Sequence, residues 1–444
     1  MTPRAAPTSP LRLLAGPPAA AGAESLADHR RRLGPLPDWS GIPGVIPVLE
    51  ASGLLGRGGA GFPVGRKWRT VAERRTGRAV VLANGAEGEP LSHKDRALMA
   101  LRPHVVIDGA LLAAGAVGAD EVILYVGAEH RAARTALSRA LAARASELLV
   151  PVRLVAAPPG YVSGEESAAV HFVNSGDARP TTVPPRVFER GVAGAATLVN
   201  NVESLANAAL IGRFGDAWYR AAGSGQTRGT ALVTVGAGMG GTVREIELGS
   251  PLAQVIADAG AHGPGSHGAG PHSSRVNGSG TLGTAMPLAR VRAILLGGYF
   301  GGWVDAAEAR GLTLDPVGLR AVGRSFGCGV VSVLPDDACG VIATARIMAY
   351  MAGQSARQCG PCVFGLGAIA GALERLATGN AARDDLGRVA RWAGMIAGRG
   401  ACRHPDGAVG LVQSALRVFG DEFEAHRRGR RCTATARASL AGVA

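Results

Sequence analysis

Lysine is almost missing from this 444-residue chain, although its formal net charge is +13. Only Lys67 and Lys94 occur, so nearly all of the positive charge comes from arginine. Aromatic residues are also scarce, at 4% of the chain. Basic patches interleaved with aromatic side chains are typical of single-strand binding, and none occurs, so we expect no nucleic-acid partner. The scattered arginines form solvated faces or, alternatively, steer an acidic protein partner.

The sequence also lacks long apolar runs. The longest nearly apolar stretch, Gly109 to Ala119, lies between two aspartates and is shorter than the roughly 20 residues that span a bilayer. The apolar part of the N-terminus is broken by Pro17 and Pro18. This favours a disordered arm over a signal peptide. We therefore expect a cytoplasmic protein without direct membrane insertion.

Cysteine is infrequent and clustered late in the sequence. Six cysteines occur: Cys328, Cys339, Cys359, Cys362, Cys402 and Cys432. In a long chain without a secretory signal, such cysteines are better interpreted as metal ligands or buried thiols than as disulfides.

The sequence begins with a Pro/Ala-rich arm at residues 1–40, which we expect to be flexible. Three successive patterns of apolar and polar residues follow. Residues 41–227 alternate apolar strand patterns with helical patterns, which predicts an α/β domain with a parallel sheet. The expected strands cover 79–83, 121–126 and 152–156, and the expected helices 45–55, 95–117, 130–148 and 200–211.

The remaining chain changes character twice. Residues 228–335 alternate apolar and polar positions between glycine turns, which indicates a small β-grasp (ubiquitin-like) domain. A Gly/Ser/His-rich insertion at 262–284 is expected to be flexible; its three histidines either lie in a solvated loop or bind a metal. Residues 336–426 indicate a helical bundle, followed by a basic tail at 427–444. Its four helices are expected at 341–351, 363–377, 384–397 and 407–426.

Four segments in the first domain carry candidate chemistry. Gly56 to Trp68 is glycine-rich, so its backbone can approach a ligand closely and point N–H groups at a phosphate, or can simply form a tight turn. Ala83 to Arg96 follows a strand and offers Asn84, Glu87 and Glu89 at the sheet edge where ligands bind in such folds. Lys67 and Lys94, the only two lysines, fall inside these two segments.

The other two segments carry carboxylate and amide side chains. Pro158 to Ser167 holds a tyrosine and two adjacent carboxylates, which serve a ligand or belong to an acidic loop. Leu198 to Leu205 holds Asn200 and Asn201, for which helix capping is the simplest explanation.

In this order, the four segments resemble the flavoprotein (51 kDa) subunit of complex I and its relatives in soluble hydrogenases and formate dehydrogenases. The resemblance runs from about Ser52 to Glu424. It implies an electron-transfer flavoprotein with FMN, an iron–sulfur cluster and NAD(H) as substrate. It also implies a ferredoxin or another iron–sulfur electron-transfer subunit as partner.

The resemblance assigns roles residue by residue. Glu89 and Glu166 are expected to face the nicotinamide nucleotide as the catalytic pair, and Phe62 to stack on its adenine. The residues expected to bind the cofactors are Gly56, Arg57, Gly58, Gly59, Ala60, Gly61, Phe62, Gly65, Lys67, Asn84, Glu87, Tyr161, Gly164, Glu165, Asn200, Asn201 and Ser204.

The sequence departs from the family pattern in its cysteine motif. The family uses Cys-x-x-Cys-x-x-Cys and a fourth, distant cysteine, but here the first position is Ala356. Cys359, Cys362 and Cys402 remain as the expected iron ligands. Three thiolates could hold a [3Fe–4S] cluster, or a [4Fe–4S] cluster with an outside ligand. Loss of the cluster, or a zinc site that adds His404, are the alternatives.

The nucleotide pocket departs as well. Thr70, Val183 and Arg186 stand where the family has aromatic or basic residues that flank NADH, and Ala86 replaces an acid. Two alternatives to an NAD(P)H-oxidising enzyme follow. One is a ferredoxin-linked flavin relay without a working nucleotide site, and the other is a scaffold subunit that has lost its cofactor.

Overall fold

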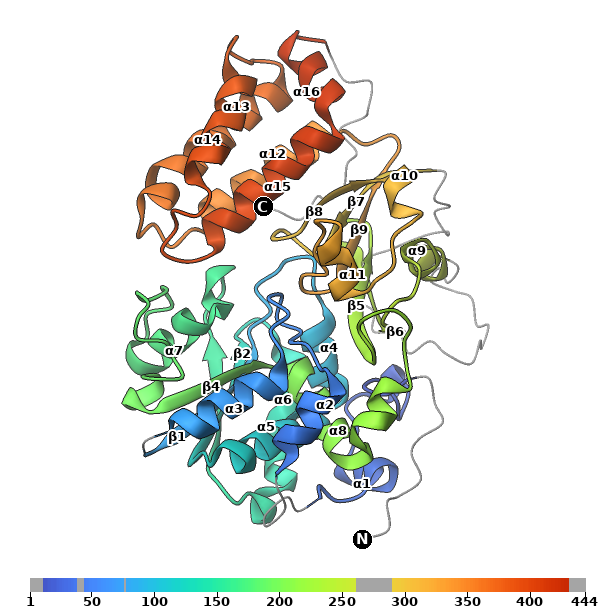
Figure 1. Cartoon of the computed structure of the whole chain (residues 1–444), viewed down its shortest axis with the longest axis vertical. Coiled ribbons are helices and arrows are strands. Elements are labelled where there is room, and N and C mark those ends of the chain that lie inside the picture. Colours follow the sequence, from blue (N-terminus) through green and yellow to red (C-terminus); the bar gives the residue numbers. More distant parts are fainter. Residues whose placement is uncertain (1–10, 38–43, 76, 261–289, 431–444) are drawn as a thin grey trace.

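The computed structural model describes residues 11–37, 44–75, 77–260 and 290–430. The expected flexible insertion at 262–284 and most of the basic tail lie outside these ranges. The chain forms three units in sequence order, and each lies against the other two (Figure 1). A parallel sheet with helices comes first, a second sheet follows, and a set of helices ends the chain.

The first sheet has the strand order β3–β2–β1–β4, and every neighbouring pair is parallel. This confirms the predicted parallel α/β arrangement. Its strands are β1 (Ala79–Gly85), β2 (Glu121–Gly127), β3 (Val152–Ala157) and β4 (Ala196–Asn201). The helices of this unit are α1 (Leu26–Leu33), α2 (Val45–Ser52), α3 (Val64–Arg74), α4 (Lys94–Leu101), α5 (Pro103–Val117), α6 (Arg131–Ala143), α7 (Glu166–Ser175) and α8 (Val202–Arg220).

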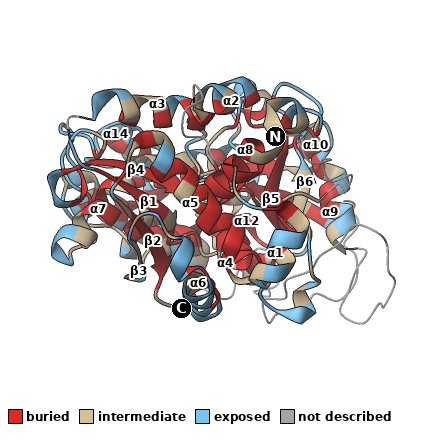
Figure 2. Ribbon diagram, turned by 90° about the horizontal axis from the view of Figure 1, so that it is seen from below, coloured by how far each residue is buried: buried red, intermediate tan, exposed pale blue. Residues whose placement is uncertain are grey.

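Neighbouring residues of each strand point to opposite faces of the first sheet. Val81 and Leu124 pack into the larger core, which includes residues of α2 to α6 and α8. Leu82 and Tyr125 pack into a smaller core with residues of α7. Both faces are therefore covered, as a parallel sheet requires, and the strands lie at the buried centre of the unit (Figure 2).

The single helix predicted for residues 95–117 is wrong. The structure has two helices, α4 and α5, which meet at an angle of 99°. Arg102 lies between them and Pro103 is the first residue of α5. A residue before proline is pushed out of the helical region, which explains the break. Within the described ranges no single helix is long and apolar enough to cross a membrane, while this bent pair passes on length and composition alone.

The helix predicted for residues 200–211 begins later than expected. Asn200 and Asn201 end strand β4, and α8 starts at Val202. The Asn201 side chain accepts hydrogen bonds from the backbone N–H groups of Glu203 and Ser204. The expected capping role is therefore present, but it is combined with a place at the end of a strand.

The expectation of a flexible arm over residues 1–40 does not hold for residues 11–37. Leu13 and Leu14 are buried, and the carboxylate of Glu245 accepts hydrogen bonds from the backbone N–H groups of Arg12, Leu13 and Leu14. This segment is thus anchored on strand β6 (Thr242–Glu247), because its N–H groups satisfy a buried carboxylate.

The second sheet has the order β6–β5–β9–β7–β8 and mixes parallel and antiparallel pairs. Residues of α9 pack on one face, and Leu295 and Trp303 on the other face pack against the C-terminal helices. Its elements are β5 (Thr230–Gly236), β6 (Thr242–Glu247), α9 (Leu252–Gly260), β7 (Val291–Leu296), β8 (Gly302–Asp305), α10 (Ala306–Ala309), α11 (Pro316–Ala321) and β9 (Val330–Pro335).

The C-terminal helices pack around one shared core (Figure 1). They are α12 (Gly340–Gly353), the π-helical turn η7 (Pro361–Gly365), α13 (Leu366–Thr378), α14 (Asp385–Ile396), α15 (His404–Val418) and α16 (Gly420–Arg427). The helix predicted over 407–426 is divided, since α15 ends at Val418 and α16 begins at Gly420. Cys402 lies in the connection between α14 and α15, as predicted.

Candidate functional site

Two asparagines lie side by side at the carboxyl edge of the parallel sheet. Strands β1 and β4 are neighbours, and their register places Asn84 opposite Asn201. The Asn84 side-chain amide donates a hydrogen bond of 2.8 Å to the carbonyl oxygen of Gly164, in the loop that follows β3. The segments after three strands therefore meet at the edge where ligands bind in open α/β sheets.

The glycine loop, Gly56 to Trp68, contacts the same edge of the sheet. The backbone N–H of Arg57 donates to Ser204 Oγ over 2.9 Å, and the Trp68 indole donates to Asn200 Oδ1 over 3.1 Å. A Cβ atom on Gly58 would lie 3.4 Å from Asn201 Cβ. Gly59 has a φ of +107° and no other atom within 4 Å of a Cβ position, so this part of the loop is open. All four segments singled out in the sequence are thus gathered.

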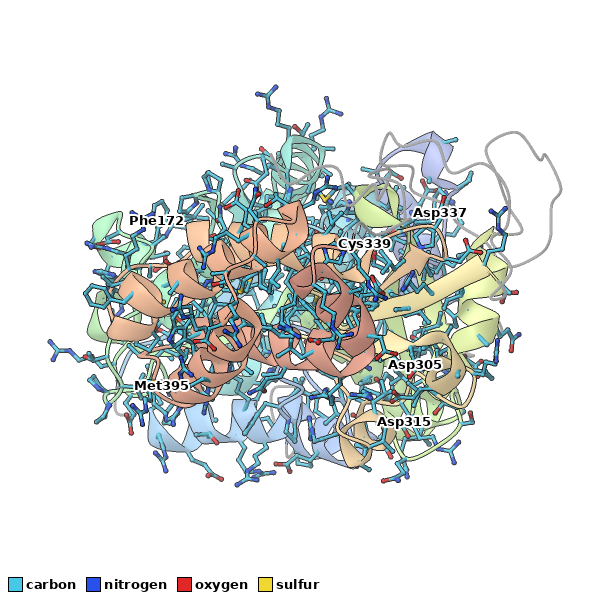
Figure 3. All side chains as sticks on the ribbon, turned by 90° about the horizontal axis from the view of Figure 1, so that it is seen from above. Phe172, Asp305, Asp315, Asp337, Cys339 and Met395 are labelled. Carbon is cyan, nitrogen blue, oxygen red and sulfur yellow. The ribbon has the colours of Figure 1, made fainter. Side chains whose placement is uncertain are left out.

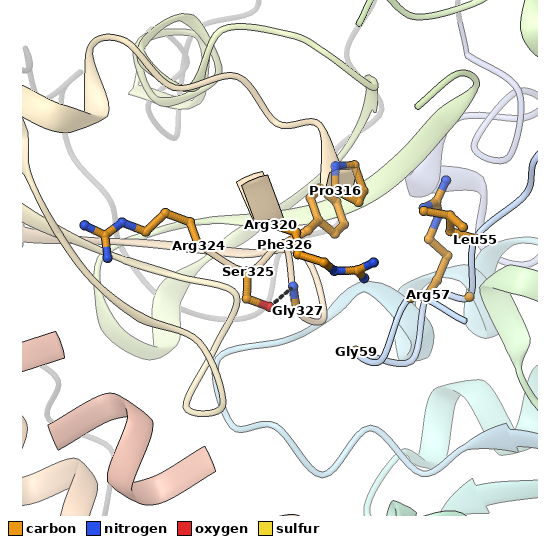
Figure 4. Close-up of a pocket in the computed structure, with 11 residues that line it drawn as sticks. Leu55, Arg57, Gly59, Pro316, Arg320, Arg324, Ser325, Phe326 and Gly327 are labelled. Atoms are coloured by element: carbon orange, nitrogen blue, oxygen red, sulfur yellow. Dashed lines mark hydrogen bonds between the residues drawn. The ribbon is translucent and has the colours of Figure 1, made fainter. Parts of the chain in front are cut away.

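A small basic hollow lies between the glycine loop and the second sheet's α11–β9 loop (Figure 4). A Cβ atom on Gly61 would lie 3.1 Å from the guanidinium of Arg320. The hollow is lined by Leu55, Gly56, Arg57, Gly59, Gly61, Pro316, Arg320, Arg324, Ser325, Phe326 and Gly327. Arg57 was expected at the site, but Arg320 and Arg324 were not, because residues 228–335 were predicted only as a separate domain.

The acidic residues of the site already have protein partners. Glu87, which has a positive φ of 46°, accepts from Ser92 Oγ and from the backbone N–H groups of Asp95 and Arg96. Glu165 caps α7 by accepting from Ser167 and Ala168. A non-glycine residue at positive φ is held by its surroundings, and such positions often cluster at functional sites.

Lys67 and Glu166 form an ion pair of 2.8 Å at the mouth of the site. Both side chains are partly exposed, so an entering ligand can exchange with either partner at modest cost. Phe62, in the same glycine-rich segment as Lys67, is 47% exposed, and the Arg66 guanidinium lies 6.0 Å from its ring centroid. Gly65 has a different role, because a Cβ atom there would lie 2.7 Å from the Glu50 backbone; close packing of α3 on α2 requires a glycine at this position.

Glu89 is a buried carboxylate whose ionisation is strongly shifted by its surroundings. It is 8% exposed, and it accepts from Tyr161 Oη at 3.0 Å, Tyr299 N at 2.8 Å and Leu91 N at 3.2 Å. Burial raises the pKa of Glu89 to about 7, because desolvation outweighs these hydrogen bonds. Tyr299 comes from the loop after β7, and nothing in the local sequence pointed to it.

A buried charge network beneath the site was also missed. Lys94 Nζ lies 2.7 Å from Asp95 and 2.9 Å from Glu203, and Asp95 accepts from the Asn201 amide. Glu203 also accepts from the backbone N–H of Leu232 on β5. The network ties the asparagine edge to the second sheet. The signal available in the sequence was that Lys94 is one of only two lysines.

The three expected iron ligands lie near one another. Cys359 and Cys402 are half-buried and Cys362 is buried. Burial and the neighbouring Cys359 raise the pKa of the Cys362 thiol to about 12, and Cys402 contributes to the same shift. Cys339 is separate from these three cysteines. It is buried against His426, and it lies far from Met395 at the end of α14, the helix that leads to Cys402 (Figure 3).

No three His, Cys, Asp or Glu side chains of the described residues converge as a single metal ion requires. The zinc alternative that includes His404 therefore lacks a formed site. A cluster is larger than one ion, and each of its ligands binds a different iron atom, so its cysteines stand further apart. The donor set of three neighbouring thiols beside the π-helical turn fits a cluster of this kind.

Five aromatic rings connect the loop after β3 to the C-terminal helices. Tyr161 lies 4.9 Å from Phe300, 5.7 Å from His404, and 6.4 Å from both Tyr299 and Tyr350, measured between ring centroids. Tyr350 is on α12 and His404 begins α15, two residues after Cys402. We call these five rings the aromatic junction. Through it, the loop after β3 contacts the helix start that follows Cys402. We call the connections that carry Cys359, Cys362 and Cys402 the cysteine loop.

Two family models match this chain. One, the Nuo51 FMN-binding domain, covers residues 49–210. The other, the NADH-ubiquinone oxidoreductase-F iron–sulfur binding region, covers residues 342–426. An NADH-quinone oxidoreductase F subunit of Rhizobium meliloti (strain 1021) is 29% identical over 87% of this chain and 90% of that protein. The corresponding F subunit of Mycobacterium bovis is 29% identical over 89% of this chain and 87% of that protein.

Solved structures agree with these matches. The NAD⁺-reducing [NiFe]-hydrogenase is similar in its H₂-reduced state with a TM-score of 0.72 and 29% identity. In its air-oxidised state the TM-score is 0.71 and the identity 30%. This chain spans 62% of the hydrogenase chain that it matches, and 86% of this chain is covered.

The fold and the gathered segments define an NADH-dehydrogenase-like electron-transfer flavoprotein, a class whose cofactors are FMN and an iron–sulfur cluster. The chain is 51 kDa-subunit-like, since it is similar to the F subunits of NADH-quinone oxidoreductase over most of its length.

Proposed function

We propose that this chain oxidises a nicotinamide nucleotide at the four-segment site and delivers the electrons to the cysteine loop. FMN, when bound, accepts a hydride and returns single electrons, which a neighbouring iron–sulfur cluster can carry. The observation that carries the proposal is the aromatic junction. It brings the Tyr161 loop, part of the gathered site, into contact with the start of α15 beside Cys402.

The chain's own residues hold and orient the ligands in this proposal. The open N–H groups of Gly58 to Gly61 and the ammonium of Lys67 bind phosphate. The amides of Asn84, Asn200 and Asn201, with Ser204, bind the polyhydroxyl chain at the sheet edge. Glu87, Tyr161, Gly164 and Glu165 line the ring side. Phe62 stacks on the adenine, since an exposed ring beside the site is available for it.

Glu89 and Glu166 form the proposed nucleotide-facing pair. Glu166 is exposed enough to exchange its Lys67 partner for a ribose hydroxyl. Glu89 is buried, so it acts from beneath the site by holding Tyr161 through a hydrogen bond of 3.0 Å. Neither residue moves a proton to the flavin in this scheme. Their work is to position the nucleotide and the tyrosine.

We also propose the three-domain division and its surroundings. The second sheet is a β-grasp domain over 228–335, and the helices over 336–426 are the iron–sulfur domain. The partner is a ferredoxin or another iron–sulfur electron-transfer subunit. A cytoplasmic location accords with the five described cysteines, none of which is paired in a disulfide.

One observation favours a second function, a flavin relay without a nucleotide site. The residues at the expected nucleotide flank are Thr70, Val183 and Arg186, and none of them offers an aromatic face. Val183 is 50% exposed and presents only an aliphatic surface. In this alternative the electrons enter from a ferredoxin.

An absorption spectrum of anaerobically purified protein separates these functions. A yellow protein bleached by NADH supports the enzyme. A yellow protein that resists NADH but is reduced by ferredoxin supports the relay. A colourless protein that does not take up added FMN would rule out both. Lys67→Met serves as the matched variant, because it removes the proposed phosphate cation and should weaken FMN binding about tenfold.

A further inference from the structure

The cysteine loop is one ligand short of a complete set. Cys359, Cys362 and Cys402 supply three thiols, and Ala356 occupies the position of the first cysteine in the family motif. Iron–sulfur clusters of the four-iron type normally take four protein ligands. The fourth ligand of such a cluster comes either from outside the chain or from a residue outside that motif.

His404 has the protonation pattern of a ligand. Its Nε2 atom lies 2.7 Å from the carbonyl oxygen of Met351. A carbonyl oxygen only accepts hydrogen bonds, so Nε2 carries the hydrogen and Nδ1 carries a lone pair. Metal-bound histidines are commonly held in this way, with one ring nitrogen donating to a backbone carbonyl and the other on the metal.

The lone pair of His404 has no partner in the protein. Nδ1 is buried and makes no hydrogen bond, and the whole residue is 2% exposed. Buried polar atoms are nearly always hydrogen-bonded, and each exception requires an explanation. A ligand bond to iron would supply one.

The position of His404 also fits. Its backbone N–H donates a hydrogen bond to the sulfur of Cys402, and Cys402 in turn interacts with both Cys359 and Cys362. The rings of Tyr161 and Phe300 cover the imidazole at 5.7 and 5.9 Å. The histidine is therefore in contact both with the rings of Tyr161 and Phe300 and, through its backbone N–H, with Cys402, at the first residue of α15.

We propose that Nδ1 of His404 is the fourth ligand of the iron–sulfur cluster held by Cys359, Cys362 and Cys402. The inference rests on the proposed function, because it assumes that a cluster is bound. Replacing a thiolate by a neutral imidazole makes the ligand set less negative by one charge. Histidine ligation raises the reduction potential of other iron–sulfur centres for the same reason, so this cluster should be easier to reduce than one with four cysteines.

The test uses the full chain, reconstituted anaerobically with iron and sulfide and labelled with ¹⁵N-histidine. Iron, sulfide and FMN are quantified, and the reduced cluster is examined by pulsed electron paramagnetic resonance. We expect four irons per chain and a strong nitrogen coupling that changes with the isotope. His404→Gln, which keeps a donor for the Met351 carbonyl, should lose this coupling and at least half of the four-iron cluster.

Two further variants separate ligation from folding. His404→Gln combined with Ala356→Cys should regain four irons, without nitrogen coupling and with a lower potential. His130→Gln is the matched control, because His130 is also buried with Nε2 near a carbonyl, that of Ala86 at 3.1 Å, outside the cysteine loop; it should leave the coupling unchanged.

Two outcomes would overturn the inference in different ways. A wild-type protein with FMN and a four-iron cluster but no strong nitrogen coupling refutes the histidine ligand and leaves the proposed function standing. A protein that binds FMN but takes up no iron refutes the ligand together with the proposed electron path to the cysteine loop.

Discussion

At the scale of single residues, Glu89 shows how burial changes the chemistry of a carboxylate. Its pKa is raised to about 7 by desolvation, against the effect of three hydrogen bonds. A carboxyl whose pKa is raised in the folded state binds more protons there than in the unfolded chain. Its contribution to stability is therefore most favourable below its ordinary pKa and declines as the pH rises towards 7.

Glu89→Gln should consequently become relatively more stable as the pH rises. The amide cannot ionise, so the difference in unfolding free energy between variant and wild type should shift by about 3 kcal/mol in favour of the variant from pH 4.5 to pH 7.5. Urea unfolding at both pH values measures this shift. Tyr161→Phe, which removes only one donor to Glu89, is the control. An equal difference at the two pH values would show that Glu89 is not a buried, titrating group.

At the scale of elements, helices α5 and α8 pack unusually closely. A Cβ atom on Gly109 of α5 would lie 2.0 Å from the carbonyl oxygen of Leu205 on α8. No side chain fits in this space. Because α8 also presents Asn201 and Ser204 at its first turn, the closeness of the two helices sets the position of the site.

Gly109→Ala should therefore destabilise the protein by about 3 kcal/mol and weaken FMN binding, because the added methyl group forces α8 to move. Gly115→Ala on the same helix is the matched control. No atom outside the helix lies within 4 Å of its Cβ position, and alanine in an exposed helix should stabilise by about 0.5–1 kcal/mol. Thermal unfolding and FMN titration measure both effects. Equal behaviour of the two variants would contradict this packing argument.

A buried carboxylate also joins four helices. Asp108 of α5 is 1% exposed and pairs with His29 of α1, Arg144 of α6 and Arg213 of α8, at 2.8, 2.7 and 2.6 Å. Several opposite charges and a hydrogen bond lower the pKa of Asp108 despite its burial. The stability it contributes is thus present above its ordinary pKa and is lost as the pH falls below it.

Asp108→Asn should cost about 3–5 kcal/mol near neutral pH, because it removes the countercharge of buried Arg213 and leaves Arg144 with only Glu147 at 3.6 Å. Asp216→Asn is the comparison, since Asp216 pairs with a half-exposed Arg220 and should cost less than about 0.5 kcal/mol. Denaturant unfolding at neutral pH measures both. A cost for Asp108→Asn as small as for Asp216→Asn would refute the bridging role.

The sequence predicted elements well where the signal was local. The strands at 79–83, 121–126 and 152–156 are apolar runs with turn residues on both sides, and each is present. Strand β4 was missed because its last two residues, Asn200 and Asn201, have the chemistry of a helix start. Tyr299 could not be predicted as the partner of Glu89, because the two are 210 residues apart and no periodicity connects them.

At the scale of the whole molecule, the three units meet at the aromatic junction. Tyr161 belongs to the first unit, Tyr299 and Phe300 to the second, and Tyr350 and His404 to the third. Each ring contributes contact area and restricted geometry. The distance between the sheet edge and the cysteines is therefore fixed by packing from all three units.

The net charge of +13 predicts electrostatic steering of an acidic electron-carrier partner. The association rate with an acidic ferredoxin should fall at least tenfold between about 20 mM and about 500 mM NaCl, because screening shortens the reach of surface charge. Stopped-flow measurement of electron delivery tests this. Delivery to a small uncharged acceptor is the control and should hardly change; an equally flat response with ferredoxin would refute steering.

The anchoring of Leu13 and Leu14 by Glu245 determines when the N-terminal segment can complete its folded contacts during synthesis. These partners are 232 and 231 residues apart. At about 5–20 residues per second, the N-terminal segment waits roughly 10–50 s for its partner to be synthesised. The first parallel sheet is complete in sequence before that moment. The hydrogen bonds that hold Leu13 and Leu14 on Glu245 therefore form only after the second sheet has begun to be synthesised.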